Sequence, residues 1–198
     1  MIRAIVSDLG KVLLGFDTEP GWGKVAATCS PRGDLRAHFA RVVEGSGFQT
    51  GAITPDQFYE LLCRECGLAM PFEEFKVAWS DQFWEDAETI ELICGAPVEK
   101  RYMLSNTNEI HWDWIRARHP EMLSRFDRLI VSHEVGLQKP DPAIFRLVVE
   151  ETGFRPEEHL FIDDIEANHA GAREIGMDTI VHTDAASLRR DFQRRGLA

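Results

Sequence analysis

Five short apolar segments recur along this chain and restrict the folds that it can adopt. They lie at residues 4–6, 102–104, 129–131, 160–162 and 179–181. Each segment is too short to form a helix, and none alternates strictly between apolar and polar residues. Such runs are typical of strands that are buried on both faces, as in a parallel sheet covered by helices. The pattern therefore predicts a five-stranded parallel sheet.

Helical segments separate the later apolar runs. One begins at Asp141 and Pro142, which suit the N-cap and the first helical position, and it ends near Gly153. Another runs from about residue 166 to 175 and ends at Gly176, because glycine favours the C-terminus of a helix. This alternation of strand and helix predicts a doubly wound, Rossmann-like α/β fold.

Residues 16–84 interrupt this alternation. No segment there has the pattern of a strand, whereas several read as helices, two of which open at Thr54 and Pro71. Because the interruption follows the first strand, we expect a small helical cap that is inserted into an α/β core. The predicted core comprises residues 1–15 and 85–198, and the predicted cap comprises residues 16–84.

The charge balance limits the partners of this chain. It has 33 acidic and 22 basic residues and a formal net charge of −11, so nucleic acids and anionic membranes would repel it. No apolar run approaches the roughly 20 residues of a membrane span, and the N-terminal residues do not resemble a signal peptide. Four cysteines in 198 residues do not indicate a disulfide framework. We therefore expect a cytoplasmic protein in which any phosphate site needs a metal ion or a local cation.

Polar residues follow four of the five apolar segments, where the predicted strands end. They are Asp8 and Gly10 after the first segment, Ser105 and Asn106 after the second, Lys139 a few residues beyond the third, and Asp163 and Asp164 after the fourth. Ligands of open α/β sheets bind at the carboxyl ends of the strands. We therefore expect these groups to meet at one rim of the sheet.

The residue types at this rim suit phosphoryl chemistry. Three carboxylates in one place repel one another and favour a hard divalent cation such as Mg²⁺, which takes oxygen ligands. Lys139 can offset the charge of a carboxylate and a phosphate together. Aspartate is an established nucleophile toward phosphoryl groups, so Asp8 can form an aspartyl phosphate.

These four motifs resemble those of the haloacid dehalogenase-like superfamily, in the same order and over essentially the whole chain. Residues 6–12 resemble its apolar strand ending in Asp-x-Asp-Gly, and residues 103–106 resemble its strand ending in Ser or Thr. Residues 136–140 match its Lys before Pro, and residues 161–164 match its acidic pair. The helical insert is similar to the small cap of one branch. Within that branch, the motif details are most similar to those of bacterial phosphatases acting on α-D-glucose 1-phosphate.

The resemblance implies a role for each matched residue around the metal. Asp8 would be the nucleophile and a metal ligand, and Gly10 would bind Mg²⁺ through its backbone carbonyl. Asp163 or Asp164 would complete the metal site, and the sequence does not rank these two.

The resemblance also implies how a small phosphorylated metabolite would bind. Ser105 and Asn106 would hold the phosphate, and Lys139 would act as a catalytic residue that orients Asp8 and the phosphate. Together these roles predict Mg²⁺-dependent hydrolysis of a small phosphate monoester such as a sugar phosphate.

One position departs from the family pattern. The usual phosphatase has a second Asp two residues after the nucleophile, where this chain has Gly10. That Asp is the general acid for the leaving alcohol, and losing such a group commonly costs about 10²–10⁴-fold in rate. Either the substrate has a good leaving group, or another residue such as Asp17 replaces the acid, or catalysis has been lost. The first alternative agrees with the glucose 1-phosphate branch, which shares this Gly.

Two further functions remain open. Haloacid dehalogenases and phosphonate-cleaving relatives also lack the second Asp, but a metal-free dehalogenase has no use for Asp163 and Asp164 as ligands. Phosphonate cleavage needs a cap lysine, and neither Lys24 nor Lys76 has an evident activating context. A degenerate member that only binds a phosphometabolite would bind Mg²⁺ without turnover.

Other conspicuous residues receive structural interpretations. His111 lies just past the second motif, where it is a candidate to line the site, but we favour a position in a solvated loop. The aromatic residues Trp79, Phe83 and Trp84 have helical spacing with their neighbours, and we expect them in the cap core.

Overall fold

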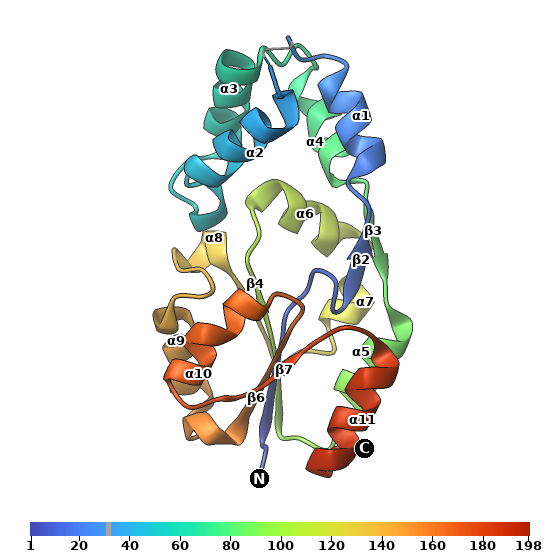
Figure 1. Cartoon of the computed structure of the whole chain (residues 1–198), viewed down its shortest axis with the longest axis vertical. Coiled ribbons are helices and arrows are strands. Elements are labelled where there is room, and N and C mark those ends of the chain that lie inside the picture. The colour runs from blue at the N-terminus through green and yellow to red at the C-terminus, as the bar shows by residue number, and fades with distance from the viewer. Residues whose placement is uncertain (31–32) are drawn as a thin grey trace.

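The computed structural model describes residues 1–30 and 33–198, with an α/β core below and a group of helices above it (Figure 1). The core contains a parallel sheet with the strand order β5-β4-β1-β6-β7. Its strands are β1 (Ala4–Ser7), β4 (Lys100–Ser105), β5 (Arg128–Val131), β6 (His159–Asp163) and β7 (Asp178–Val181). Each strand contains one of the five apolar segments, so the predicted five-stranded parallel sheet is confirmed.

Helices cover both faces of this sheet, which explains why the strands are apolar throughout. Ile5 of β1 packs in a cluster on one face, and the next residue, Val6, packs in a cluster on the other. The first cluster takes side chains from α5 (Ala87–Gly95), α6 (Glu109–Arg118), α7 (Pro120–Leu123) and α11 (Ala185–Arg195). The second cluster takes them from α9 (Pro142–Thr152) and α10 (His169–Glu174). Successive residues of a strand point to opposite faces, so both must be apolar.

The two predicted core helices form where their end signals lie. The Asp141 carboxylate accepts a hydrogen bond from the backbone N–H of Ala143 at 2.8 Å and caps α9, which ends before Gly153 at φ 69°. The helix expected at residues 166–175 is divided into a 3₁₀ turn, η3 (Glu166–Asn168), and α10. A further short helix, α8 (Ser132–Val135), follows β5, and a 3₁₀ turn, η2 (Pro156–Glu158), precedes β6.

The upper group of helices has an apolar cluster of its own. It comprises α1 (Glu19–Ala26), α2 (Leu35–Gly45), η1 (Phe48–Thr50), α3 (Pro55–Cys66) and α4 (Phe72–Ser80). Thr54 and Gln57 form a reciprocal capping box at the start of α3. Phe58 and Phe75 are fully buried in the cluster, which also takes Ile110 from α6 of the core. The exact division of the chain into core and cap stays a prediction.

The expectation that residues 16–84 contain no strand is wrong at both ends of that range. β2 (Leu14–Phe16) and β3 (Phe83–Glu85) pair antiparallel and form the ribbon that joins the core to the upper helices (Figure 1). Three residues are too few for a periodic pattern, and the partners lie far apart in the sequence. A Cβ on Gly15 would lie 2.4 Å from Nε1 of Trp84, so the absence of a side chain there lets the Trp84 indole lie against the partner strand. None of the helices in the described part of the chain has the length and apolar character needed to cross a bilayer.

The helix α10 packs against the loop that follows Lys139, and this contact requires a glycine. A Cβ on Gly171 would lie 2.0 Å from the carbonyl oxygen of Pro140 and 3.0 Å from Cε2 of Phe145. We expect Gly171→Ala to lower the free energy of unfolding by about 2–3 kcal/mol, measured by urea denaturation, because the loop must move.

The matched control is Gly23→Ala, which also lies inside a helix. A Cβ there meets nothing within 4 Å, so the substitution is expected to stabilise the protein by about 0.5–1 kcal/mol. Equal effects of the two substitutions on the free energy of unfolding would show that the close contact at Gly171 does not contribute to stability.

Candidate active site

A buried lysine joins two of the predicted carboxylates. Lys139 is 2% exposed, and its Nζ donates hydrogen bonds to Oδ1 of Asp8 at 2.7 Å and to Oδ2 of Asp163 at 2.6 Å. A third bond goes to the backbone carbonyl of Leu104 at 3.0 Å. The three N–H donors of the ammonium are therefore all used, and its direction is fixed.

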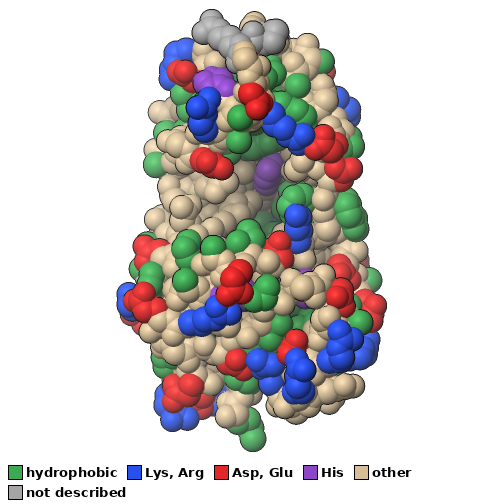
Figure 2. Space-filling view, in the orientation of Figure 1, with side chains coloured by type: hydrophobic (Ala, Val, Ile, Leu, Met, Phe, Trp, Pro, Cys, Tyr) green, Lys and Arg blue, Asp and Glu red, His purple; other side chains and the backbone are tan. Residues whose placement is uncertain are grey.

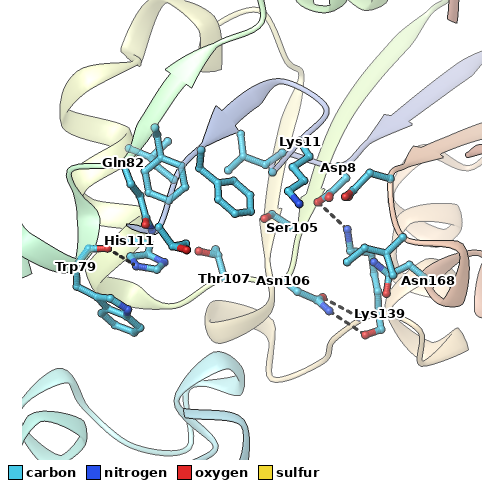
Figure 3. A pocket seen from close by; sticks show the side chains of 18 residues that line it. Asp8, Lys11, Trp79, Gln82, Ser105, Asn106, Thr107, His111, Lys139 and Asn168 are labelled. Carbon is cyan, nitrogen blue, oxygen red and sulfur yellow. Dashed lines mark hydrogen bonds and ion pairs between the residues drawn. The ribbon is translucent and has the colours of Figure 1, made fainter. Parts of the chain in front are cut away.

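The backbone of Lys139 is held as firmly as its side chain. The Asn106 carboxamide donates from Nδ2 to the Lys139 carbonyl and accepts at Oδ1 from the Lys139 N–H, both at 2.8 Å (Figure 3). Asn106 therefore braces the loop that carries the lysine, and both polar atoms of its side chain are engaged. Its predicted role in holding the phosphate stays a prediction.

Asp163 is fully buried, and its carboxylate is saturated with hydrogen bonds. Oδ1 accepts from the Ile165 N–H at 2.8 Å, and Asn168 Nδ2 lies 3.0 Å from each carboxylate oxygen. With the Lys139 bond, Asp163 has no face turned to the cavity. The adjacent Asp164 is half-buried and lines the cavity instead.

Carboxylate oxygens of Asp8, Asp163 and Asp164 lie within 4.8 Å of one another. Burial raises the pKa of Asp8 to about 6, although the Lys139 charge opposes this shift, and the Asp163 charge adds to it. Burial also raises the pKa of Asp164, as does the Asp163 charge, whereas Lys11 and Lys139 act to lower it. The carboxylates repel one another when they are all ionised, and a divalent cation relieves this repulsion. Because the donors are hard oxygen atoms, Mg²⁺ suits the cluster.

A cavity of about 430 Å³ opens in front of these carboxylates, between the core and the upper helices, where the surface is hollowed (Figures 2 and 3). Its far wall is largely aromatic and comes from β2, α4, β3 and α6. The side chains of that wall are Phe16, Trp79, Phe83 and His111. The volume lies within the usual range of small-molecule sites.

The structure brings the predicted site residues together. Those that line the cavity are Asp8, Gly10, Ser105, Asn106, Lys139 and Asp164. Asp163 lies behind them. Ser105 is buried at the end of β4. Asp17, considered as a replacement acid, is exposed, and its carboxylate accepts a bond from the Glu19 N–H at 3.0 Å. It does not line the cavity.

The expectation that His111 lies in a solvated loop is wrong. His111 is in the first turn of α6, and its Nε2 donates to the Trp79 carbonyl at 3.1 Å while its Nδ1 accepts from Asn108 at 3.2 Å. Burial lowers the pKa of His111 to about 4, so the ring is neutral at pH 7. The hydrogen bond from His111 to the Trp79 carbonyl links α4 to the core.

Several cavity residues carried no signal in the sequence. Trp79, Phe83 and Trp84 were expected only in the cap core. Trp79 and Phe83 face the cavity, although Trp79 also stacks on Phe58, and Trp84 is exposed on β3. Other lining residues outside the predicted set include Lys11, Phe16, Thr18, Gln82, Thr107 and Asn168. Lys11 and Thr107 lie within or directly after a motif, whereas Gln82, like Trp79 and Phe83, comes from a segment remote from all four. Asn168 follows the acidic pair closely, so proximity to a motif was the available hint.

A sequence model of haloacid dehalogenase-like hydrolases matches residues 2–176. The chain belongs to this family. The predicted hydrolase class and the α/β Rossmann-like fold are therefore confirmed.

Relatives with known names extend this comparison. A D-ribitol-5-phosphate phosphatase from Bacteroides thetaiotaomicron is 29% identical, with 97% of each chain covered. A haloacid dehalogenase family enzyme from the same organism, solved in complex with magnesium and inorganic phosphate, has a TM-score of 0.76 and 26% identity. That comparison covers 95% of this chain and 99% of the other. The predicted phosphatase class and Mg²⁺ cofactor agree with these relatives.

The family match also includes parts of larger proteins. Rat bifunctional epoxide hydrolase 2 is 39% identical over 161 residues, which cover 73% of this chain and 29% of the rat protein. This chain therefore corresponds to only part of that relative.

The raised pKa of Asp8 predicts how Mg²⁺ binding depends on pH. Below about pH 6 the metal-free site holds a proton on Asp8, which must leave before the carboxylate can bind a cation. The apparent Mg²⁺ affinity should fall with decreasing pH, by up to about tenfold per pH unit. Calorimetric titration with Mg²⁺ measures this dependence on chelator-treated protein, at pH values from about 5 to about 8 in steps of about one unit or less.

The control is Asp8→Asn, which binds Mg²⁺ more weakly but lacks the ionisable group. Its affinity should vary less with pH than that of the wild-type protein. An identical pH dependence in the two proteins would exclude Asp8 as its source.

Proposed function

We propose that this chain is a Mg²⁺-dependent phosphatase that hydrolyses a small sugar or polyol phosphate through an aspartyl phosphate at Asp8. The observation that carries this proposal is the position of Asp8. Its carboxylate is fixed at one oxygen by the buried Lys139, lies in a cluster of three carboxylates, and lines a cavity of small-molecule size.

The reaction needs one free oxygen on the nucleophile. Lys139 holds Oδ1 of Asp8, so the other carboxylate oxygen attacks phosphorus, and the bond from phosphorus to the leaving oxygen breaks. In the second step water attacks phosphorus and the bond to Asp8 breaks, which releases inorganic phosphate. Lys139 keeps the carboxylate in the orientation required for both displacements.

Asp8, Asp164 and the carbonyl of Gly10 would hold the metal ion. When bound, Mg²⁺ offsets the charge of the phosphoryl oxygens. Asp163 supports the site from behind, because its oxygens are occupied by Lys139, Asn168 and the Ile165 N–H. The donor set is all oxygen, as this ion prefers.

Phosphate binding falls to the loop that follows β4. Ser105 lies at the cavity end of the strand, where its hydroxyl can donate a hydrogen bond to a phosphate oxygen. The Asn106 side chain acts as a positioning group for Lys139.

The far wall supports a polyhydroxylated leaving group. Aromatic faces alternate there with the Thr18 and Thr107 hydroxyls and the Gln82 carboxamide. The relative named for D-ribitol 5-phosphate and the motif resemblance to glucose 1-phosphate phosphatases both support this substrate class. A metal-free dehalogenase would leave the three carboxylates with only the Lys139 ammonium to offset their charge, so the cluster favours phosphatase chemistry over halide release.

The first test is release of inorganic phosphate from D-ribitol 5-phosphate, α-D-glucose 1-phosphate, an acyl phosphate and p-nitrophenyl phosphate. We expect turnover that requires Mg²⁺ and falls by at least about 10⁴-fold in Asp8→Asn, because the nucleophile is removed. No release from any substrate, with Mg²⁺ still bound, would contradict catalysis and favour a binding protein. Metal-independent halide release from a 2-haloacid would favour the dehalogenase.

The two adjacent carboxylates give a second test. Asp164→Asn should weaken Mg²⁺ affinity about tenfold or more and leave the unfolding midpoint nearly unchanged, because Asp164 lines the cavity. Asp163→Asn should lower the unfolding midpoint of the metal-free protein, because it removes the buried partner of Lys139. Calorimetry measures the Mg²⁺ affinity and thermal unfolding measures the midpoint. If Asp163→Asn weakened Mg²⁺ binding and Asp164→Asn lowered the midpoint instead, Asp163 would be the metal ligand and Asp164 the structural partner.

A further inference from the structure

Lys11 has a backbone conformation that a residue with a side chain rarely adopts. Its φ is 55°, and among residues 1–30 and 33–198 it is the only residue other than glycine with a positive φ. A tight loop imposes this conformation, since the Lys11 N–H bonds to the Leu14 carbonyl at 2.7 Å and the Leu14 N–H bonds to the Leu9 carbonyl at 2.8 Å. Glycine would fit this position without strain. A lysine retained here is a candidate for a functional role.

The Lys11 side chain and the gap at Gly10 belong to one arrangement. A Cβ on Gly10 would lie 3.3 Å from Cε1 of Phe16, so a larger residue there would press on that ring. The Lys11 ammonium lies over the same ring, 5.3 Å from its centroid, where the electron-rich face attracts a cation. The Lys11 side chain lies beside Asp8 in the cavity (Figure 3).

The charges that line the cavity are unbalanced. Asp8 and Asp164 line the cavity with Asp163 behind them, the Lys139 ammonium pairs with Asp8 and Asp163, and a bound phosphate would add further negative charge. Lys139 has no donor left for a substrate. Lys11 is the other basic residue among the described residues that line the cavity, and it forms no ion pair with any of them. Its three N–H donors are available to a ligand.

We propose that Lys11 binds the leaving oxygen of the substrate and places a fixed positive charge where the Asp of the usual motif would stand. As the bond from phosphorus to that oxygen breaks, its electron pair moves to the oxygen, and the ammonium stabilises the charge by a hydrogen bond. The proton that completes the alcohol comes from solvent, and Lys11 stays protonated throughout. This proposal rests on the proposed phosphatase function.

The experiment compares two leaving groups. Lys11→Met is assayed with the sugar or polyol phosphate that the wild-type protein hydrolyses fastest and with p-nitrophenyl phosphate, whose leaving group is weakly basic. We expect kcat/KM for the sugar phosphate to fall by about 100-fold and that for the aryl phosphate by less than about threefold. The strongly basic alkoxide needs the positive charge, and the aryl oxide does not.

Three further variants exclude other causes. Lys11→Arg keeps the charge and should recover most of the sugar phosphate activity. Lys11→Gly should lose activity as Lys11→Met does, yet unfold at a temperature at least as high as wild type, because it relaxes the positive φ. Lys24→Met makes the same charge change on the exposed surface of α1 and should leave both activities unchanged.

The outcomes distinguish the role of Lys11 from the phosphatase function on which it rests. Equal loss with both substrates would assign Lys11 to the phosphate and overturn its role at the leaving oxygen. No loss with either substrate would remove Lys11 from the site altogether. If the wild-type protein released no phosphate from any compound, the phosphatase function would fall, and the role of Lys11 with it.

Discussion

The buried ammonium of Lys139 is the interaction on which the rest of the site depends. It lies between Asp8 and Asp163, which would otherwise repel each other in a place with little solvent. One charge for two carboxylates leaves the cluster short of positive charge, and this deficit favours a divalent cation. The same lysine is fixed through its backbone by Asn106, so the geometry of the nucleophile is set by a loop more than thirty residues from β4.

The contacts that hold this loop show how the fold serves the site. Gly171 in α10 lets the backbone at Pro140 approach within a distance that no side chain would allow. Asn168, one turn earlier, donates to both oxygens of Asp163. The end of β6 and the segment after it therefore supply the acidic pair and also the support that keeps Lys139 in place. A substitution in this segment is therefore expected to affect both the packing of α10 and the position of Lys139.

The entrance of the site combines elements from both parts of the molecule. The β2–β3 ribbon places Phe16 and Phe83 against the cavity, and neutral His111 ties the Trp79 carbonyl of α4 to the core. An aromatic wall excludes part of the solvent around a bound substrate, which strengthens the electrostatic interactions made there. The absence of a side chain at Gly10 leaves room for the Phe16 ring, and the Lys11 ammonium lies over that ring.

The sequence by itself determined the parallel sheet and the positions of Asp8, Ser105, Lys139 and the acidic pair, because these depend on local patterns. Apolar runs mark strands buried on both faces, and strand ends mark the ligand rim. Only the tertiary structure decided which acid of the pair faces the cavity, how β2 pairs with β3, and where Trp79 and His111 lie. These features arise from contacts between segments far apart in the chain, and such contacts leave no periodic trace in a single sequence.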